Sequence, residues 1–159
     1  MSQTKPDLRI AVVSDTHGLL RPEVLAAIRG VDHILHAGDV GDPAILLALR
    51  EIAPVTAIRG NIDTKGPCAQ LAATEMVELG GRFFYLVHSI ADLDISPAAA
   101  GVAAVIYGHS HQPAEERRNG VLYLNPGSVG PRRFRLPIAM AFVNVRDREL
   151  ATERVQFEV

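Results

Sequence analysis

The segment Leu8–Gly18, LRIAVVSDTHG, joins an apolar run directly to a polar loop. Its first part, Leu8–Ser14, is rich in β-branched residues, so we predict a buried strand that ends where Asp15 opens the loop. The same arrangement returns at His33–Ala37, followed by GDVG, and at Val55–Arg59, followed by GNID. Because helical patterns separate these runs, the chain predicts parallel βαβ units and an α/β sheet.

Two helices are expected between these strands. Arg21–Arg29 carries apolar residues at helical spacing and stops at Gly30, a residue type that commonly follows a helix end. Asp42 and Pro43 form an N-cap and first-turn pair, and an apolar stripe then continues to Glu51. Each helix would return the chain to the start of the next parallel strand.

The second half of the chain predicts hairpins in addition to crossovers. Gly80-Gly81 and Asn119-Gly120 are strong turn signals, and each lies between two short apolar or alternating runs. The predicted elements are strands at Glu75–Leu79, Arg82–Val87, Val102–Tyr107, Glu115–Arg118, Val121–Leu124, Ile138–Val145 and Glu149–Phe157, and a short Ala-rich helix opening at Ser96-Pro97. Since no repeat or linker interrupts the pattern, we expect a single domain over residues 1–159.

The composition indicates an ordinary globular protein, with 48% hydrophobic and 21% charged residues. A net charge of −2 offers no basic face for a nucleic-acid partner. The single cysteine, Cys68, excludes a disulfide within the chain and fits a reducing cytosol, where a buried or inert thiol is expected. Because Met1–Asp7 lacks an apolar leader core and no run approaches the length of a membrane span, we expect a cytoplasmic protein without a membrane anchor.

Polar clusters follow directly after five of the predicted strands. They are Asp15-x-His17, Gly38-Asp39, Gly60-Asn61, His88 and Gly108-His109-x-His111. Ligands of open α/β sheets bind beyond the carboxyl ends of the strands, so these loops are expected to converge. A single His or Asp in such a place is more often a hydrogen-bonded loop residue, and only the combination predicts a site.

The seven side chains of these clusters have the chemistry of a metal site. Four imidazoles, two carboxylates and one amide suit Mn, Fe, Zn, Co or Ni, and the lack of thiolates argues against a structural zinc site. Seven ligands also exceed the needs of one tetrahedral ion. If Asp39 bridges, two ions about 3.5 to 4 Å apart could share the set, as in two-metal phosphoryl-transfer sites.

The ordered motifs D-x-H, G-D, G-N, a lone His and G-H-x-H resemble those of the calcineurin-like metallophosphoesterase superfamily. The match spans roughly Asp15–Ser128, and the chain's size and its Asn125–Ser128 stretch, NPGS, resemble the small bacterial and archaeal phosphodiesterase branch (YfcE-like). This resemblance implies a four-layer α/β/β/α sandwich of two mixed sheets flanked by helices. It also implies a metal-dependent phosphodiesterase for a small or aryl phosphate ester, with phosphomonoesterase activity as a variant.

The resemblance further implies a role for each ligand. One divalent ion would be held by Asp15, His17 and His111, the other by Asn61, His88 and His109, and Asp39 would bridge them. Mn²⁺ is favoured for both positions, with Fe, Zn, Ni or Co as alternatives. A metal-bound hydroxide would attack phosphorus in line, so Asp39, Asn61 and His109 are the predicted catalytic residues.

Two positions depart from the family pattern. Many members have a His directly after the Gly-Asn pair, placed to protonate the leaving group, and this chain has Ile62 there. General-acid help would then be missing or would come from water or a neighbouring acid such as Asp63. The usual His-Gly-His has also become His88-Ser89-Ile90, which keeps the ligand His and changes the loop beside it.

Several other polar residues have weaker functional interpretations. We interpret His33 and His36, in or beside the second strand, as packing or supporting residues. Four arginines could contact a substrate phosphate or a neighbouring subunit, or simply lie in solvated loops, and are left out of the catalytic set. They are Arg59, Arg132, Arg133 and Arg135.

Two rival functions remain open at this point. The retromer scaffold subunit of eukaryotes resembles the same small branch and serves mainly as a binding surface, so a non-catalytic metal-binding interaction scaffold is the alternative. Because all seven ligand positions carry competent residues, we favour the enzyme. Purely structural ions are the weaker rival, since structural sites are usually closed and tetrahedral. Self-association into a homo-oligomer is left open.

Overall fold

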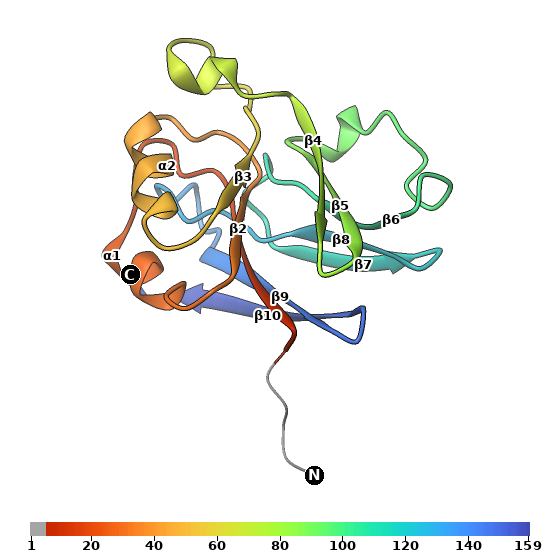
Figure 1. Cartoon of the computed structure of the whole chain (residues 1–159). Helices are drawn as coiled ribbons and strands as arrows, with labels where there is room; N and C mark the ends of the chain where they lie inside the picture. Colours follow the sequence, from red (N-terminus) through yellow and green to blue (C-terminus); the bar gives the residue numbers. More distant parts are fainter. Residues whose placement is uncertain (1–5) are drawn as a thin grey trace.

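The computed structural model describes residues 6–159, which form two five-stranded mixed sheets (Figure 1). Residues 1–5, on which part of the expectation about a leader rests, lie outside the described residues. The first sheet has the order β10-β9-β1-β2-β3 and contains β1 (Leu8–Val13), β2 (His33–His36), β3 (Val55–Ala57), β9 (Ile138–Arg146) and β10 (Glu149–Phe157). The second has the order β4-β5-β6-β8-β7 and contains β4 (Thr74–Leu79), β5 (Arg82–Val87), β6 (Val102–Ile106), β7 (Ala114–Arg118) and β8 (Val121–Asn125).

Apolar layers fill the space on both faces of the first sheet. Successive side chains of a strand point to opposite faces, and in β1 Ile10 and Val12 enter the core between the two sheets. Ala11 and Val13 face the other way, into a cluster formed with α1 (Pro22–Ala27) and α2 (Pro43–Arg50). This explains why the first strand is apolar at every buried position instead of alternating.

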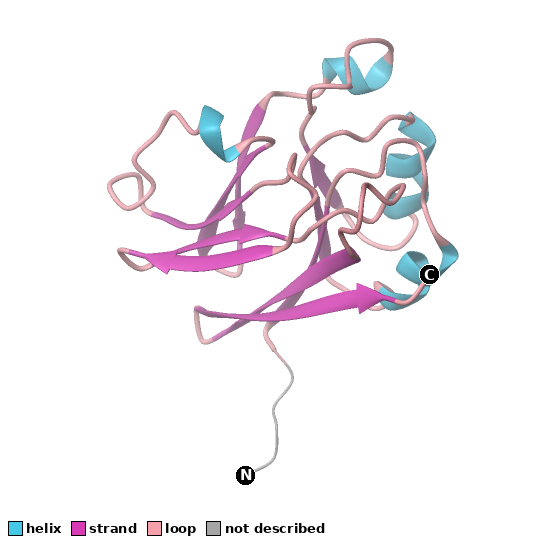
Figure 2. Ribbon diagram, turned by 180° about the vertical axis from the view of Figure 1, so that it is seen from behind, coloured by secondary structure: helices cyan, strands magenta, loops and turns pink. Residues whose placement is uncertain are grey.

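The outer face of the second sheet carries a smaller apolar cluster. Leu93 and Ile95, which follow the short 3-10 helix η2 (Ile90–Asp92), pack against it. Seen from behind, α1 and α2 lie together beside one sheet and η2 lies beside the other (Figure 2). The predicted sandwich of two mixed sheets flanked by helical segments is therefore confirmed, with the lighter cover on the second sheet.

The helix predictions were right in two cases and wrong in one. Asp42 caps α2 by accepting a hydrogen bond from the Ala44 N–H at 2.9 Å, as its position before Pro43 predicted. The Ala-rich helix predicted from Ser96 is absent, because the segment forms only turns before Gly101 reverses the chain with φ +75°. A helix of so few residues is unstable without an apolar face to bury. The sequence also did not predict η1 (Pro67–Gln70) or η2.

The predicted hairpin turns are confirmed. Gly80 and Gly81 have φ of 61° and 78°, and Asn119 and Gly120 have φ of 52° and 78°. Two consecutive residues with positive φ match the right-handed twist of the strands they join. The charged turn between β9 and β10 reverses in the same conformation without glycine, through Asp147 and Arg148, at φ 51° and 66°.

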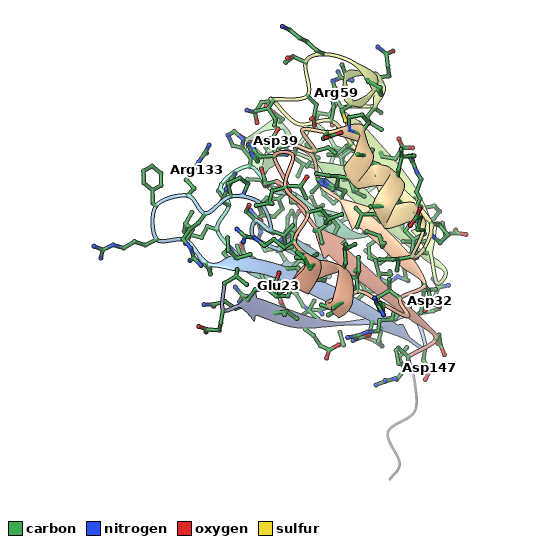
Figure 3. The ribbon with its side chains drawn as sticks, turned by 90° about the vertical axis from the view of Figure 1, so that its left-hand side faces the viewer. Glu23, Asp32, Asp39, Arg59, Arg133 and Asp147 are labelled. Carbon is green, nitrogen blue, oxygen red and sulfur yellow. The ribbon has the colours of Figure 1, made fainter. Side chains whose placement is uncertain are left out.

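The parallel strands determine where the polar loops meet. In the first sheet β1, β2 and β3 are parallel, and in the second β5, β6 and β8 are parallel. In Figure 3, Asp39 and Arg59 lie near one end of the molecule, and Asp32 and Asp147 lie near the opposite end. Among residues 6–159, no helix has the length and apolar character needed to span a bilayer.

Candidate metal centre

All seven predicted ligand residues lie just beyond the carboxyl ends of parallel strands. They follow β1 (Asp15, His17), β2 (Asp39), β3 (Asn61), β5 (His88) and β6 (His109, His111). Contacts of 3.8 Å or less link the seven side chains into one continuous cluster. The two sheets thus bring together the residues that the motifs singled out.

The first group consists of Asp15, His17 and His111, whose potential ligand atoms lie within 4.8 Å of one another. Asp15 Oδ1 is 3.4 Å from His111 Nε2 and 3.6 Å from His17 Nε2. Among the described residues, Asp15 Oδ1, His17 Nε2 and both ring nitrogens of His111 are buried without a hydrogen-bond partner. Buried polar atoms are normally satisfied, so this concentration of unpartnered atoms fits a bound cation.

The second group is centred on the Asn61 side chain. Its Oδ1 lies 3.0 Å from His88 Nε2 and 3.1 Å from His109 Nδ1. The backbone carbonyl of Ala37 accepts a hydrogen bond from His88 Nδ1 at 2.7 Å. With the proton of neutral His88 held on Nδ1, the lone pair of Nε2 points toward Asn61 and Asp39, which is the orientation of a metal ligand.

Asp39 lies between the two groups. Its Oδ2 is 3.2 Å from His17 Nε2 and 3.3 Å from His88 Nε2. Asp15 also approaches both groups, but its Oδ1 is 3.8 Å from His88 Nε2. Asp39 Oδ2 lies at nearly equal, shorter distances from a histidine of each group, so Asp39 is favoured as the shared ligand.

Both carboxylates are held in the ionised form. Burial by itself would raise the pKa of Asp15, but the nearby His111 and His17 and a hydrogen bond from Ser14 hold that pKa far below its usual range. Burial likewise opposes ionisation of Asp39, and its contact with His88 together with the Ile62 N–H still lowers its pKa. Two buried, ionised carboxylates beside four imidazole rings form a strong cation site.

The backbone at the cluster is in a costly conformation. Asp15, His17, Asp39, His109 and His111 have φ of 57°, 47°, 57°, 71° and 63°. Non-glycine residues seldom adopt the left-handed region, and such residues concentrate at functional sites where the surrounding structure maintains them. Five of the seven candidate ligands share this feature, which the sequence did not reveal.

Close packing around the carboxylates explains two of the motif glycines. A Cβ on Gly60 would lie 2.1 Å from Asp39 Oδ1, and one on Gly108 would lie 2.1 Å from the Ser14 hydroxyl. Neither contact is sterically allowed. The glycines therefore let the loops after β3 and β6 approach the loops that carry Asp39 and Asp15.

The two other histidines in the first sheet serve the scaffold, as the sequence predicted. His33 hydrogen-bonds the Thr56 hydroxyl at 2.8 Å. His36 is completely buried, and burial lowers its pKa to about 4, so it stays neutral and its Nδ1 accepts a hydrogen bond from the Gly38 N–H. Cys68 is a buried free thiol whose pKa is raised by burial, which confirms the expectation of a buried thiol.

Asp63 has a structural role that was not predicted from the sequence. Its carboxylate is buried and accepts hydrogen bonds from the N–H groups of Val40, Gly41 and Gly60 at 2.8 to 3.1 Å. A carboxylate held by three donors does not fit the role of a proton donor, so the suggestion that Asp63 supplies the leaving-group proton is wrong. Its sequence signal was only its place three residues after Gly60.

A pocket of about 510 Å³ opens beside the second group. Asn61, His88 and His109 line it on the metal side, and the rest of its lining includes Arg59, Asp92 and Asp94. The hydroxyl of Tyr85 holds Asp94 by a hydrogen bond of 3.0 Å. The size and polar lining suit a small, partly polar ligand next to the metal ligands.

The four arginines fall into different environments. Arg59 lines the pocket and donates to the carbonyl of Leu71 at 2.7 Å. Arg132 donates to the backbone carbonyls of Leu136 at 3.2 Å and Val159 at 2.9 Å. Arg133 and Arg135 are exposed on the same loop, and Arg133 projects outward in Figure 3.

Comparisons with known proteins agree with this architecture. A family model described as a calcineurin-like phosphoesterase superfamily domain matches residues 8–148. A probable metallophosphoesterase from Methanothermobacter thermautotrophicus is 35% identical over 147 residues, which cover 82% of this chain and 83% of the relative. The phosphodiesterase YfcE from Escherichia coli is 30% identical over 146 residues, which cover 77% of this chain and 79% of YfcE.

Solved structures show the same fold. Vps29 from Entamoeba histolytica, in complex with Zn²⁺, matches with a TM-score of 0.70 and 20% identity, covering 95% of this chain and 100% of Vps29. At this identity the likeness establishes the fold alone.

Proposed function

Because this chain belongs to the calcineurin-like phosphoesterase superfamily, we propose that it hydrolyses a small or aryl phosphate ester, preferably a diester, at a centre of two divalent metal ions. The observation that carries the proposal is the cluster of buried, unpartnered ligand atoms on Asp15, His17 and His111, continuous with the second group. The match to metallophosphoesterases over most of the chain supports a metal-dependent hydrolase.

The proposed ligand sets follow the two groups. Asp15, His17 and His111 would hold one ion, Asn61, His88 and His109 the other, and Asp39 would bridge them. Mixed nitrogen and oxygen donors suit divalent transition ions, of which we propose Mn²⁺, with Fe, Zn, Ni or Co as alternatives. When bound, such ions activate a water and stabilise charge on the attacking and leaving oxygens of the phosphoryl group.

The chain's own residues prepare the site for this chemistry. Ionised Asp39 and Asp15 supply the negative charge that draws cations, and the Ala37 carbonyl keeps Nε2 of His88 free to bind. Asn61 and His109 face the pocket, so a substrate there would meet the second ion's ligands first. We therefore propose Asp39, Asn61 and His109 as catalytic residues.

An activity screen tests this proposal. Metal-free protein is loaded with Mn²⁺, metal content is measured, and bis(p-nitrophenyl) phosphate and p-nitrophenyl phosphate are compared as substrates. We expect hydrolysis of both, faster for the diester. A protein that holds two ions per chain and hydrolyses neither substrate would support the non-catalytic scaffold.

We propose that residues 1–159 make up one domain that acts in the cytoplasm on a small substrate, without nucleic-acid or membrane partners. The buried thiol of Cys68 is compatible with a reducing compartment. Size-exclusion chromatography with light scattering decides between a monomer and a homo-oligomer.

The pH dependence of activity follows from the histidine ligands. Burial would lower the pKa of His88, but Asp39, the Ala37 carbonyl and Asp15 outweigh it and raise that pKa above 6.5 in the metal-free protein. The protonated ring therefore stabilises the metal-free fold below the unfolded pKa, and this contribution is lost as pH rises through the folded pKa. Metal needs the neutral ring, so protons compete with metal as pH falls.

We accordingly expect kcat/KM to fall below about pH 6, because protons then compete with the metal for the histidine ligands. Raising the Mn²⁺ concentration should move this acidic limb to lower pH. The measurement is a pair of pH profiles at low and saturating Mn²⁺. A limb that stays in place at both concentrations would point to a titrating group other than the ligands.

Ile62 determines how strongly kcat is expected to depend on the acidity of the leaving group. It is 40% exposed next to Asn61, and its side chain carries no proton to donate. Aryl diesters should therefore be hydrolysed faster than alkyl esters. General-acid help is worth about 10²- to 10⁴-fold, so Ile62→His should raise kcat for alkyl esters by up to about 10²-fold and change aryl esters little.

The readout is the slope of log kcat against leaving-group pKa, which should flatten in Ile62→His. Ile62→Asn, which is polar but cannot donate a proton of suitable acidity, is the matched control. If the wild-type protein already shows a flat slope for the chemical step, water or another acid lining the pocket, such as Asp92, supplies the proton.

A further inference from the structure

The carboxylate of Asp63 fastens together the two loops that carry Asp39 and Asn61. Its Oδ2 accepts hydrogen bonds from the N–H groups of Val40 at 3.1 Å and Gly60 at 2.8 Å, and its Oδ1 accepts one from Gly41 at 3.0 Å. Val40 directly follows Asp39, and Gly60 directly precedes Asn61. One side chain thus fixes the backbone next to two candidate ligands.

A second contact runs in the opposite direction between the same loops. The N–H of Ile62 donates to Asp39 Oδ1 at 3.0 Å, while the other oxygen of Asp39 faces the histidines. Asp39 holds its unusual φ of 57° at this junction. The orientation of its free oxygen therefore depends on how the loop after β3 is held, and Asp63 holds that loop.

A carboxylate is particularly suited to this position. Three N–H groups converge on it, and an ionised Asp offers two oxygens that only accept hydrogen bonds. An Asn would turn an NH₂ group toward at least one of these donors. Because only 4% of Asp63 is exposed, water does not replace the lost acceptor.

We propose that Asp63 is a positioning residue that sets the affinity for the second metal ion by fixing Asp39 and Asn61 relative to His88. This inference rests on the two-metal function proposed above. The first ion's set, Asp15, His17 and His111, lies on the loops after β1 and β6, to which the Asp63 carboxylate makes no hydrogen bond among residues 6–159. Asp39 is shared by both proposed sets, and its backbone carbonyl accepts a hydrogen bond from the His17 N–H at 2.9 Å, whereas Asn61 belongs to the second set alone. A change at Asp63 should therefore weaken both ions, and the second more than the first.

The test is calorimetric titration of metal-free protein with Mn²⁺, which measures the number of ions bound and both dissociation constants. Substitutions of residues that support metal ligands typically cost about 10- to 100-fold in affinity, so Asp63→Asn should weaken the second ion by that factor and the first, which shares only Asp39, by a smaller factor. Asp63→Ala, without an acceptor, should weaken the second ion further.

Asp32→Asn is the matched control. Asp32 also accepts a backbone hydrogen bond, from Arg9 N–H at 2.7 Å, but it lies at the opposite end of the molecule from Asp39 (Figure 3). This variant should bind both ions like the wild type. Circular dichroism of each metal-free variant checks that the fold is kept.

Two results overturn the proposal while leaving the two-metal function intact. One is an unchanged second dissociation constant in Asp63→Asn, and the other is an equal loss at both ions, which assigns Asp63 a general structural role. If the Ala variant does not fold, the Asn variant decides, and failure of both to fold also assigns a structural role. A wild-type protein that binds fewer than two ions contradicts the two-metal function itself, and this proposal with it.

Discussion

Replacing Asp39 with Ala should reduce kcat by roughly 10³-fold or more, because a shared ligand supports both ions and several kcal/mol of transition-state stabilisation depend on them. Its Oδ2 lies 3.2 Å from His17 Nε2 and 3.3 Å from His88 Nε2, between the two groups. No other single substitution of a ligand should reduce kcat as much. Metal content per chain, measured together with kcat, checks the result.

Two companion variants make this prediction specific. Asp32→Ala removes an exposed carboxylate far from the site and should leave metal content and kcat unchanged. Asp15→Ala should lose mainly the first ion. If Asp15→Ala lowers kcat more than Asp39→Ala does, the bridging role belongs to Asp15. If Asp39→Ala still binds two ions and has normal kcat, Asp39 is not the bridging ligand.

Removing the metal should abolish activity, and adding Mn²⁺ or another transition ion should restore it. Imidazoles dominate the ligand set, so Mg²⁺, which prefers oxygen ligands, should restore activity poorly. The measurement is turnover of bis(p-nitrophenyl) phosphate after verified metal removal and again after each ion is added back. Full activity in excess chelator would contradict a metal-dependent mechanism.

Metal removal should also lower thermal stability, which gives a readout independent of catalysis. An ion that binds only the folded state adds about 2.7 kcal/mol at 100 times its dissociation constant. In a chain of this size that corresponds to roughly 5 to 10 °C in Tm. Asp32→Ala should show the same shift as the wild type, whereas Asp39→Ala should show little or none.

The fold could be predicted because the strongest signals in the sequence are local. The apolar run of β1, the cap at Asp42 and the Asn119-Gly120 turn each determine their own conformation from neighbouring residues. The helix predicted from Ser96 is absent because the local signal there was not enough. Its helical propensity is real, but a helix this short forms only where packing supports it.

The order of the motifs along the chain was enough to select the candidate ligands. Each lies where an apolar strand ends, and parallel strands place such ends at one edge. His36 and His88 show where this reasoning stops, because both are histidines at a strand end. The sequence assigned His36 to packing because it lies within its strand and His88 to the ligand set because it follows its strand, but neither position shows which ring nitrogens can bind metal.

By itself, the sequence determined the α/β class, the strands and the set of residue types that could bind metal, since these depend on periodicity and side-chain chemistry. Only the tertiary structure decided which atoms are free. His36 has both ring nitrogens engaged, by the Thr16 hydroxyl and the Gly38 N–H, whereas the Ala37 carbonyl engages Nδ1 of His88 and leaves Nε2 facing Asn61 and Asp39. Asp63 likewise supports the backbone instead of acting as an acid, because a loop 22 to 23 residues earlier in the chain brings the N–H groups of Val40 and Gly41 to its carboxylate, beside that of the nearby Gly60.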